Sequence, residues 1–319
     1  MSKYPRIDLS AVRRYSIRDR FSKVHKDSLA KPHVVGSSFA EFLASLSDIL
    51  AAHDLKELVE HIVQARIRQK PFIFMMGAHV IKVGLSPVVV DLMRERIITC
   101  VAMSGAGIIH DAELALFGQT SEEVADGLAD GSFGMALETG QFLNEAIKEG
   151  QTHQLGLGEV VGKKLVEAQA PGLEHSILGN AYRLDIPATV HVGVGTDIIH
   201  QHPDADGAAI GDTSFRDFQI FAAHVAGLHD GGVVFNFGSN VILPEVFLKA
   251  LTVARNIHGR VQDFYTANFD MIQHYRPRVN VVQRPTLLGG KGYRFTGHHE
   301  IMLPLIAAAI KEELKKHES

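Results

Sequence analysis

The residues with the clearest chemical potential follow an apolar run. Ile97 to Ala102 is a largely β-branched segment that ends in the turn Met103-Ser104-Gly105-Ala106-Gly107, and His110 and Asp111 follow where helix formers resume. This pattern predicts a buried parallel strand, a tight turn and a helix N-terminus. Glycines at such a turn let the backbone approach a pyrophosphate, and free N–H groups at the helix start favour negative charge. The segment therefore indicates nucleotide binding.

Three further segments carry the same signal. We expect strands at 188–194, 233–237 and 264–266, and each ends in small or polar residues such as Gly195-Thr196-Asp197. Because the carboxyl ends of parallel strands lie along one edge of a sheet, these turns are predicted to line one crevice. The Gly-x-Gly-x-x-Gly fingerprint is absent, so this is not a standard dinucleotide fold.

Strands that alternate with helices predict an α/β protein with a doubly wound, mostly parallel, Rossmann-like sheet. Further elements are a strand at 72–76 and helices at about 213–229, 244–258 and 298–317. Residues 1–36 are basic with little periodicity, and we expect an arm that lies over the domain or a neighbouring subunit. Residues 37–319 are expected to form a single α/β nucleotide-binding domain, since 319 residues suit one large domain.

Local signals place several helix boundaries. Ser38 with Glu41, and Thr120 with Glu123, have the spacing of capping boxes, while Ser86-Pro87 is typical of a helix start. The first helical region, from about residue 39, is expected to break near His53-Asp54. Glycines at 127, 131 and 134 predict a second break within the segment that Thr120 opens, because glycine disfavours a helix interior.

Composition and charge exclude several classes of protein. The formal net charge of -4 gives no reason to expect a nucleic-acid partner. No apolar run approaches the roughly 18 residues needed to cross a bilayer, and no signal peptide is recognisable, which predicts a cytoplasmic protein without a membrane partner. The single cysteine, Cys100, lies inside an apolar strand and is expected to be a small buried hydrophobe.

The order of these segments resembles deoxyhypusine synthase and its bacterial homologues over about residues 70–310. The family's Thr-Thr-Ala-Gly-Gly-Ile-Glu-Glu-Asp is matched by Met103 to Asp111, and its Gly-Ser-Leu-Gly-Asp-Met-Ile by Gly193 to Ile199. Its Asn-Thr-Ala-Gln-Glu-Phe-Asp is echoed by Thr266 to Asp270, and its Phe-Pro-Leu-Leu by Met302 to Leu305. The resemblance implies a Rossmann-like domain that binds NAD and assembles as a homotetramer or homodimer.

The resemblance also implies which residues would contact NAD, through backbone N–H groups, hydroxyls and carboxylates at the strand ends. The expected cofactor-binding residues are Gly77, His79, Ser104, Gly105, Gly107, Gly195, Thr196, Asp197, Thr266, Ala267 and Asp270.

Departures from the family's pattern limit what else carries over. Ile242 stands where the family has its reactive lysine, and isoleucine cannot form an imine. Ile109 and His110 replace two glutamates that grip the family's amine substrate, which removes attraction for a polyamine. Arg276 and Arg278 replace acidic residues and predict a small-molecule substrate that carries negative charge. Formation of deoxyhypusine is therefore not expected.

We expect an NAD-binding enzyme that acts on a small metabolite by hydride transfer. His110 or His200, or else His191, would be the general base, since imidazole titrates near physiological pH. Lys82, or Lys291 in its glycine-flanked segment, could replace the missing nucleophile, which leaves open an NAD-dependent aminoalkyl transferase.

Two other classes remain open. A metal-dependent hydrolase would draw ligands from His110-Asp111, Asp197, His200-Gln201-His202 and His298-His299-Glu300. No spacing typical of a metal site occurs among them, so no metal is predicted. A non-catalytic protein that binds NAD or a related nucleotide would also fit the loss of the lysine.

Overall fold

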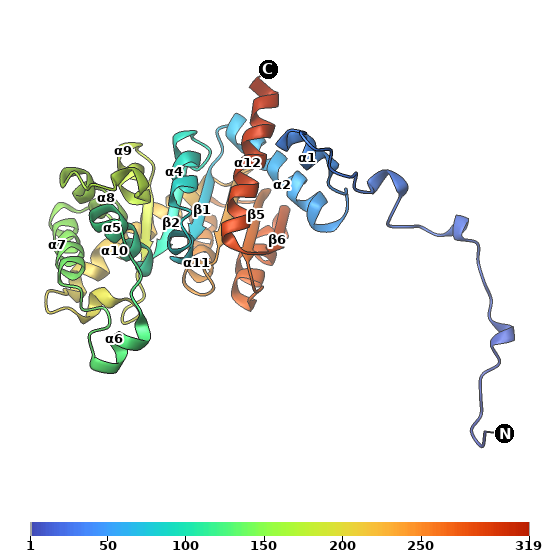
Figure 1. The fold of residues 1–319 in the computed structure, drawn as a ribbon, viewed down its shortest axis with the longest axis horizontal. Coiled ribbons are helices and arrows are strands. Elements are labelled where there is room, and N and C mark those ends of the chain that lie inside the picture. The colour runs from blue at the N-terminus through green and yellow to red at the C-terminus, as the bar shows by residue number, and fades with distance from the viewer. Residues whose placement is uncertain (1, 319) are drawn as a thin grey trace.

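The computed structural model describes residues 2–318 and contains one six-stranded sheet in the order β3-β2-β1-β4-β5-β6 (Figure 1). Every strand pair is parallel, with Ile73 opposite Cys100 in β1 and β2, and Phe72 opposite Val233 in β1 and β4. The chain runs from β1 through β2 to β3 at one edge of the sheet. It then returns to form β4 on the other side of β1 and continues through β5 to β6 at the opposite edge. This order, with its reversal between β1 and β4, is that of dinucleotide-binding doubly wound sheets.

The strands are β1 (Phe72–Met76), β2 (Cys100–Ser104), β3 (Ala188–His191), β4 (Val233–Phe237), β5 (Phe264–Asp270) and β6 (Gly290–Thr296). The helices are α1 (Phe39–Ser45), α2 (Leu50–Ile67), α3 (His79–Lys82), α4 (Ser86–Arg94), α5 (Gly105–Phe117), α6 (Val124–Asp130), α7 (Leu137–His153), α8 (Leu157–Glu167), α9 (Ile177–Arg183), α10 (Gly207–Ala226), α11 (Ile242–His258) and α12 (His299–Glu318).

Alternate side chains of the strands enter two separate cores. In β1, Phe72, Phe74 and Met76 pack with residues from α2, α4, α5 and α12, whereas Ile73 and Met75 pack with residues from α10 and α11. All five β1 side chains are buried. A continuous apolar run, without alternating polar residues, predicts a parallel strand that is buried on both faces. The prediction of a doubly wound sheet is therefore confirmed.

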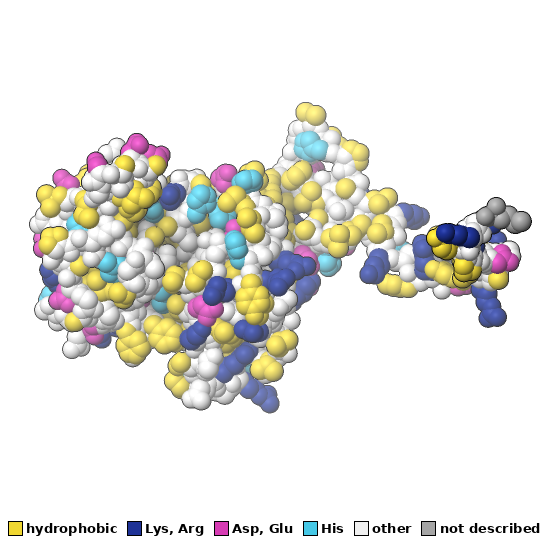
Figure 2. Space-filling model, turned by 90° about the horizontal axis from the view of Figure 1, so that it is seen from below, with side chains coloured by type: hydrophobic (Ala, Val, Ile, Leu, Met, Phe, Trp, Pro, Cys, Tyr) yellow, Lys and Arg dark blue, Asp and Glu magenta, His cyan; other side chains and the backbone are white. Residues whose placement is uncertain are grey.

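The carboxyl ends of all the strands lie along one edge of the sheet. In Figure 1 this is the lower edge, where α12 begins before it rises to the C-terminus. Figure 2 looks onto the same edge from below and shows histidine side chains across its middle, beside a group of Lys and Arg side chains. The expectation that the four turns share one edge is met by this arrangement.

Residues 2–36 leave the domain as an extended arm with three single 3-10 turns (Figure 1). Every residue from Ser2 to Phe21 is exposed, including the large apolar side chains of Ile7, Leu9 and Tyr15. Residues 2–21 therefore do not lie over their own domain, whereas Ser28 and Lys31 exchange backbone hydrogen bonds with Asp48 and Ser45. Among the described residues, none of the helices is long and apolar enough to pass through a bilayer.

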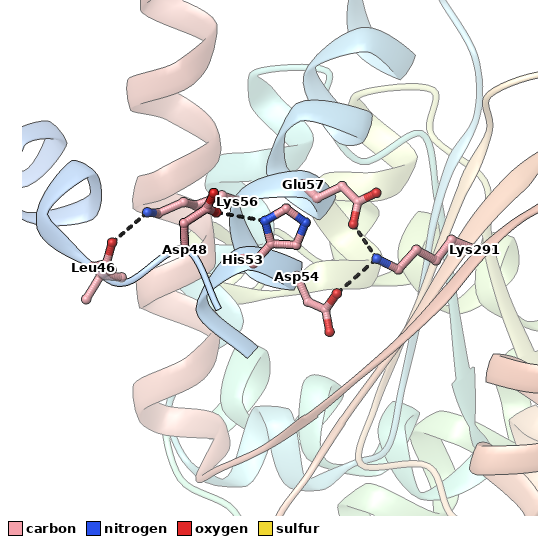
Figure 3. Close-up of polar contacts among 7 residues, drawn as sticks. All are labelled: Leu46, Asp48, His53, Asp54, Lys56, Glu57 and Lys291. Atoms are coloured by element: carbon pink, nitrogen blue, oxygen red, sulfur yellow. Dashed lines mark hydrogen bonds and ion pairs between the residues drawn. The ribbon is translucent and has the colours of Figure 1, made fainter. Parts of the chain in front are cut away.

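Two expected helix boundaries differ from the structure. The expected break lies before His53-Asp54, between α1, which ends at Ser45, and α2, which begins at Leu50. The His53 ring bonds the carboxylate of Asp48, which precedes the start of α2 (Figure 3). Ser86 makes no capping hydrogen bond, although Pro87 does occupy the first turn of α4. The capping box of Ser38 with Glu41 is confirmed, and so is the break near the glycines, which separates α6 from α7.

Strand β6 is absent from the sequence-based expectation. Its segment, Gly289-Gly290-Lys291-Gly292-Tyr293, has the composition of a flexible loop. The structure instead pairs it with β5 and buries Tyr293 and Phe295. A Cβ on Gly292 would overlap the Val282 carbonyl, so this glycine permits close packing rather than flexibility.

Edge strand β3 is anchored by a buried carboxylate. Asp217 in α10 accepts hydrogen bonds from the Gly158 N–H at 2.9 Å and the Val190 N–H at 2.7 Å, which ties α8 and β3 together. Burial raises the pKa of Asp217 to about 8, against an ordinary value of 3.8, and these hydrogen bonds oppose the rise. The folded chain therefore binds a proton here that the unfolded chain has already released.

We expect Asp217 to make the unfolding free energy fall as pH rises from about 6.5 to 8, by up to about 2 kcal/mol, because over this range its folded carboxyl group holds a proton that the unfolded one has released. The buried histidines, such as His191 with a pKa lowered by burial to about 3, act in the opposite direction, because they lose their protons near pH 6.5 in the unfolded chain. The fall is therefore measured by urea denaturation as the difference between the wild type and the Asp217→Asn variant, which keeps the histidines but lacks the titrating carboxyl group. An equally steep fall in that variant would contradict the assignment.

Candidate functional site

The turn from β2 to α5 brings backbone donors to the carboxyl edge. Ser104 is the N-cap residue of α5 and its side chain makes no capping bond, so the first N–H groups of the helix are left for other acceptors. A Cβ on Gly105 would overlap the Asp197 carboxylate, and a Cβ on Gly107 would lie 2.7 Å from the Met103 sulfur. Both glycines are therefore required by close packing around the start of α5.

Asp197, from the segment after β3, places its carboxylate against this helix N-terminus. Its side chain is buried, and Oδ2 has no hydrogen-bond partner among the described residues. Burial raises the pKa of Asp197, while the His200 ring and the Ala106 N–H oppose the rise. An unpartnered buried acceptor is costly, so it marks a position where a donor from a ligand would be stabilising.

A cavity of about 690 Å³ opens beside these groups. This volume is within the range of small-molecule sites. Its walls come from α3, α5, the segment after β3, and the α6–α7 region. The polar and charged lining residues are Lys82, His110, Glu113, Gln119, Thr120, Ser121, Glu122, Glu138, Thr139, Thr196 and Asp197.

A chain of hydrogen bonds fixes the orientation of His110 in this cavity. The Thr120 hydroxyl lies 2.5 Å from Glu113 Oε2 and 2.7 Å from His110 Nδ1. The other carboxylate oxygen of Glu113 accepts from the Thr139 hydroxyl at 2.9 Å. His110 Nε2 has no partner among the described residues and is not sealed from solvent.

Thr120 does not form the capping box expected from the sequence. Helix α6 begins at Val124 with Glu123 as its N-cap residue, so Glu123 is too early to be the third helical residue. The Thr120 side chain instead turns back toward α5, where it bonds Glu113 and His110.

The environment of His110 favours its neutral form. Burial lowers the pKa of His110, the carboxylate of Glu113 raises it, and the ammonium of Lys82 lowers it further. The net direction is downward, so the imidazole is neutral near physiological pH. A neutral imidazole with one open nitrogen in a cavity has the properties of a general base.

The cavity is lined by more carboxylates than cations. Glu113, Glu122, Glu138 and Asp197 are the acidic residues, against Lys82 alone. Arg276 and Arg278, expected to attract an anion, do not line it. Both are exposed on the segment after β5, and Arg276 pairs with Glu245 of α11 at 3.3 Å. The structure therefore separates the arginines from the cavity.

The ends of β1, β4 and β5 bring together a second group of predicted residues beside α12. Gly77 donates its N–H to the Phe237 carbonyl, and its missing side chain makes room for Gly238. The His79 and His299 rings lie 5.7 Å apart edge-to-face. Buried Asp270 leaves Oδ2 without a partner among the described residues, as His299 leaves Nδ1. This group adjoins the reversal between β1 and β4.

Some predicted cofactor residues are not at the edge. Thr266 and Ala267 lie in the middle of β5, opposite Val234 and Phe235, because β5 continues to Asp270 rather than ending at Thr266. Their side chains are fully buried in the sheet. Gly195 is exposed in the segment after β3 with φ +83°, and Thr196 beside it lines the cavity.

Lys291 lies toward the amino ends of the strands, away from the carboxyl ends that border the cavity. Its partner across the ladder is Tyr265, which pairs with Val233 at the start of β4. Its ammonium pairs with Asp54 at 3.0 Å and with Glu57, both in α2 (Figure 3). The structure therefore does not bring Lys291 to the cavity, and Lys82 is the lysine that lines it.

The other histidines singled out in the sequence, His191, His200 and His202, also lie outside the cavity lining. His191 is buried, contacts the Thr189 hydroxyl and packs edge-to-face on Phe221, which makes it a core residue. His200 follows Asp197 by three residues, and its Nδ1 lies 2.9 Å from the Asp197 carbonyl oxygen. It does not line the cavity. His202 is buried, and Nε2 lies 2.9 Å from the Gly134 carbonyl.

The residues proposed as metal ligands do not converge. Asp111 instead accepts from the Ser176 hydroxyl at 2.6 Å and from two backbone N–H groups of α9. Within residues 2–318, the group of side chains close enough to hold a cation is Glu60, Glu313 and His317, on α2 and α12. None of them was predicted, and they lie apart from the cavity.

Ile242 does not lie in the cavity of His110. It lines a separate, mainly apolar hollow of about 410 Å³ between α10 and α11. The position that matches the reactive lysine of the deoxyhypusine synthase family therefore lines a different hollow from the one that contains His110.

Glu113, Thr120 and Thr139 were missed as site residues. Thr120 and Glu113 are seven residues apart, and Thr139 is 26 residues from Glu113. No helical or strand period connects such positions. Glu113, three residues after His110 on the largely apolar α5, is the signal that could have drawn attention to the network.

Neither the known protein families nor the curated proteins include a match to this sequence. Solved structures do match the fold. The ternary complex of AgrE with ornithine and NAD+ has a TM-score of 0.54 at 13% identity, covering 83% of this chain and 33% of that one. The apo structure of ArgZ, described as an arginine dihydrolase of the cyanobacterial ornithine-ammonia cycle, has a TM-score of 0.52 at 13% identity, covering 84% and 34%.

A putative deoxyhypusine synthase from Entamoeba histolytica has a TM-score of 0.50 at 11% identity, covering 86% of this chain and 93% of that one. A putative LOR/SDH protein from Methanococcus maripaludis S2 has a TM-score of 0.51 at 15% identity, covering 82% and 70%. This chain spans about a third of the length of AgrE and ArgZ. The fold is therefore deoxyhypusine synthase-like and is shared with NAD-binding proteins.

Proposed function

We propose that this chain is an NAD-dependent enzyme that removes hydride from a carbon beside an amine in a small metabolite, with His110 as the general base. The observation that carries the proposal is the position of His110 in a cavity beside the N-terminus of α5. There, burial and Lys82 lower the pKa of His110, and Thr120 engages Nδ1 while Nε2 stays open.

The residues around the cavity fit a dinucleotide. The N–H groups at the start of α5 other than that of Ala106, which faces Asp197, would donate to phosphate oxygens, and Lys82 offers a positive charge. Asp197 Oδ2, which lacks a partner, suits a ribose hydroxyl as its donor. The AgrE complex with NAD+ supports this assignment, because about a third of that longer chain shares this fold.

The carboxylates favour a substrate with a positive charge. Four acidic side chains and one lysine line the cavity, so an ammonium group is attracted and a carboxylate repelled. This reverses the preference expected from Arg276 and Arg278, which are outside the cavity. The ornithine in the AgrE complex is an amine-bearing ligand and supports the same class.

The chemistry requires a proton and a hydride to leave the substrate. His110 Nε2 accepts a proton from the substrate ammonium, which leaves a neutral amine whose nitrogen lone pair can expel hydride from the adjacent carbon. Bound NAD+ would accept that hydride. The products are an iminium ion, NADH and a protonated His110, so charge and atoms balance. Glu113 lies close enough to stabilise the imidazolium through Thr120.

The Gly105→Ala variant tests the cofactor part of the proposal. The added methyl group would overlap Asp197 and displace its carboxylate from the start of α5. We expect NAD+ affinity to fall by at least about tenfold, equivalent to about 1.4 kcal/mol, in isothermal titration calorimetry. Gly207→Ala is the matched control, because a Cβ there meets no atom within 4 Å. Equal affinity in both variants would contradict the assignment.

A further inference from the structure

The hydrogen bonds around His110 have a direction that the donor and acceptor chemistry determines. An ionised carboxylate can only accept, so the Thr120 hydroxyl must donate its proton to Glu113 Oε2 across 2.5 Å. The Thr120 oxygen is then free to accept, and the group within 2.7 Å of it is His110 Nδ1. The neutral imidazole must therefore carry its proton on Nδ1, which leaves the lone pair on Nε2.

We propose that Glu113 and Thr120 are positioning residues that hold His110 in the tautomer whose Nε2 acts as the base. The inference deepens the proposed function and rests on it for the identity of the proton donor. The arrangement places a hydroxyl between the carboxylate and the imidazole, where a direct carboxylate–histidine contact would serve the same purpose in other enzymes.

The surrounding contacts keep this chain in place. Glu113 and His110 are one turn apart on α5, and the second oxygen of Glu113 is held by Thr139 from the start of α7. Thr120 lies on the segment between α5 and α6, so three separate segments meet at Glu113. When Nε2 takes a proton, Nδ1 keeps its own, and the Glu113 charge stabilises the imidazolium through the unchanged hydrogen bonds.

Other charged groups line the cavity that contains His110. Lys82 lies on α3, Asp197 follows β3, and Glu122 and Glu138 come from the α6–α7 region. Lys82 opposes protonation of His110 and the carboxylate of Glu113 favours it. Glu113 is distinguished from the other three carboxylates because Thr120 connects it to the ring through hydrogen bonds.

Histidine-selective ¹⁵N NMR of the full chain tests the inference without turnover, with His110→Gln identifying the resonance. We expect Nδ1–H in the wild type and in Thr120→Ser, which keeps the hydroxyl. Thr120→Val should shift His110 toward the Nε2–H tautomer, because Nδ1 loses its acceptor. Thr139→Val should retain Nδ1–H, because it removes a hydroxyl from Glu113 but not from His110. A wild type in the Nε2–H form, or no change in Thr120→Val, would overturn the inference.

Kinetics with NAD+ and an amine substrate supply the second readout. Thr120→Val should lower kcat by about 10- to 100-fold with little change in KM, and Thr120→Ser should restore most of it. Glu113→Gln should move the acidic limb of the kcat/KM profile to lower pH, because His110 loses a stabilising charge. Thr252→Val, which removes an exposed hydroxyl on α11, is the matched control. A Thr120→Val variant with wild-type kcat would overturn the inference, whereas the expected tautomers without any turnover would contradict only the proposed function.

Discussion

Replacing His110 with alanine is expected to lower turnover by about 10²- to 10⁴-fold, the usual contribution of a general base. The reason is that the neutral imidazole lines the cavity with one nitrogen bound to Thr120 and the other open. Affinity for NAD+ should change little, because the groups that fit the dinucleotide are Asp197, Lys82 and the start of α5. The decrease should be measured as formation of reduced nicotinamide at saturating substrate.

His258→Ala is the matched control for this variant, because His258 is an exposed histidine at the end of α11. It should retain wild-type turnover. A His110→Ala variant that binds NAD+ and turns over at the wild-type rate would remove His110 from the proposed mechanism.

The largest effect on stability is expected for Asp111→Ala. Asp111 is fully buried and accepts from the Ser176 hydroxyl, the Ile177 N–H and the Leu178 N–H, so it joins α5 to the N-terminus of α9. Removing the carboxylate leaves three buried donors without a partner. We expect a loss of about 3 to 5 kcal/mol in unfolding free energy, measured by urea denaturation.

Asp126→Ala provides the control, since Asp126 is exposed in the first turn of α6. Its substitution should cost less than about 1 kcal/mol. A loss below about 1 kcal/mol in Asp111→Ala as well would show that the bonds to α9 contribute little. Because Asp111 and His110 are neighbours on α5, a large loss would also show that these bonds hold the helix of the proposed base against α9.

Sequence patterns predicted the sheet better than the helix ends. The apolar runs of β1 and β4 match the structure residue for residue, because burial on both faces leaves little choice of side chain. Strand β6 was not predicted, since Gly290 and Gly292 serve close packing against neighbouring backbone, which only the folded chain reveals. The Thr120 capping box was wrong because the threonine has a tertiary partner that competes with the local one.

The candidate site could be predicted in part. Turn chemistry placed Gly105, Thr196 and Asp197 at one edge. In the structure Thr196 and Asp197 line the cavity with His110 and Lys82, and Gly105 packs against Asp197. Arg276 and Lys291 carry charges that looked available in the sequence, yet both are paired with carboxylates outside the cavity. The partners Glu245 and Asp54 come from distant segments, and no spacing along the chain reveals such pairs. The same limit applies to the bonds that orient His110.

The central claim is that a nicotinamide dinucleotide binds beside the N-terminus of α5. Titration of NAD+ into the purified chain, followed by calorimetry, tests it most directly. The account predicts saturable binding with a Kd between about 1 µM and 1 mM, in the wild type and in His110→Ala alike. Absence of saturable binding to a chain that is folded by circular dichroism would contradict the account.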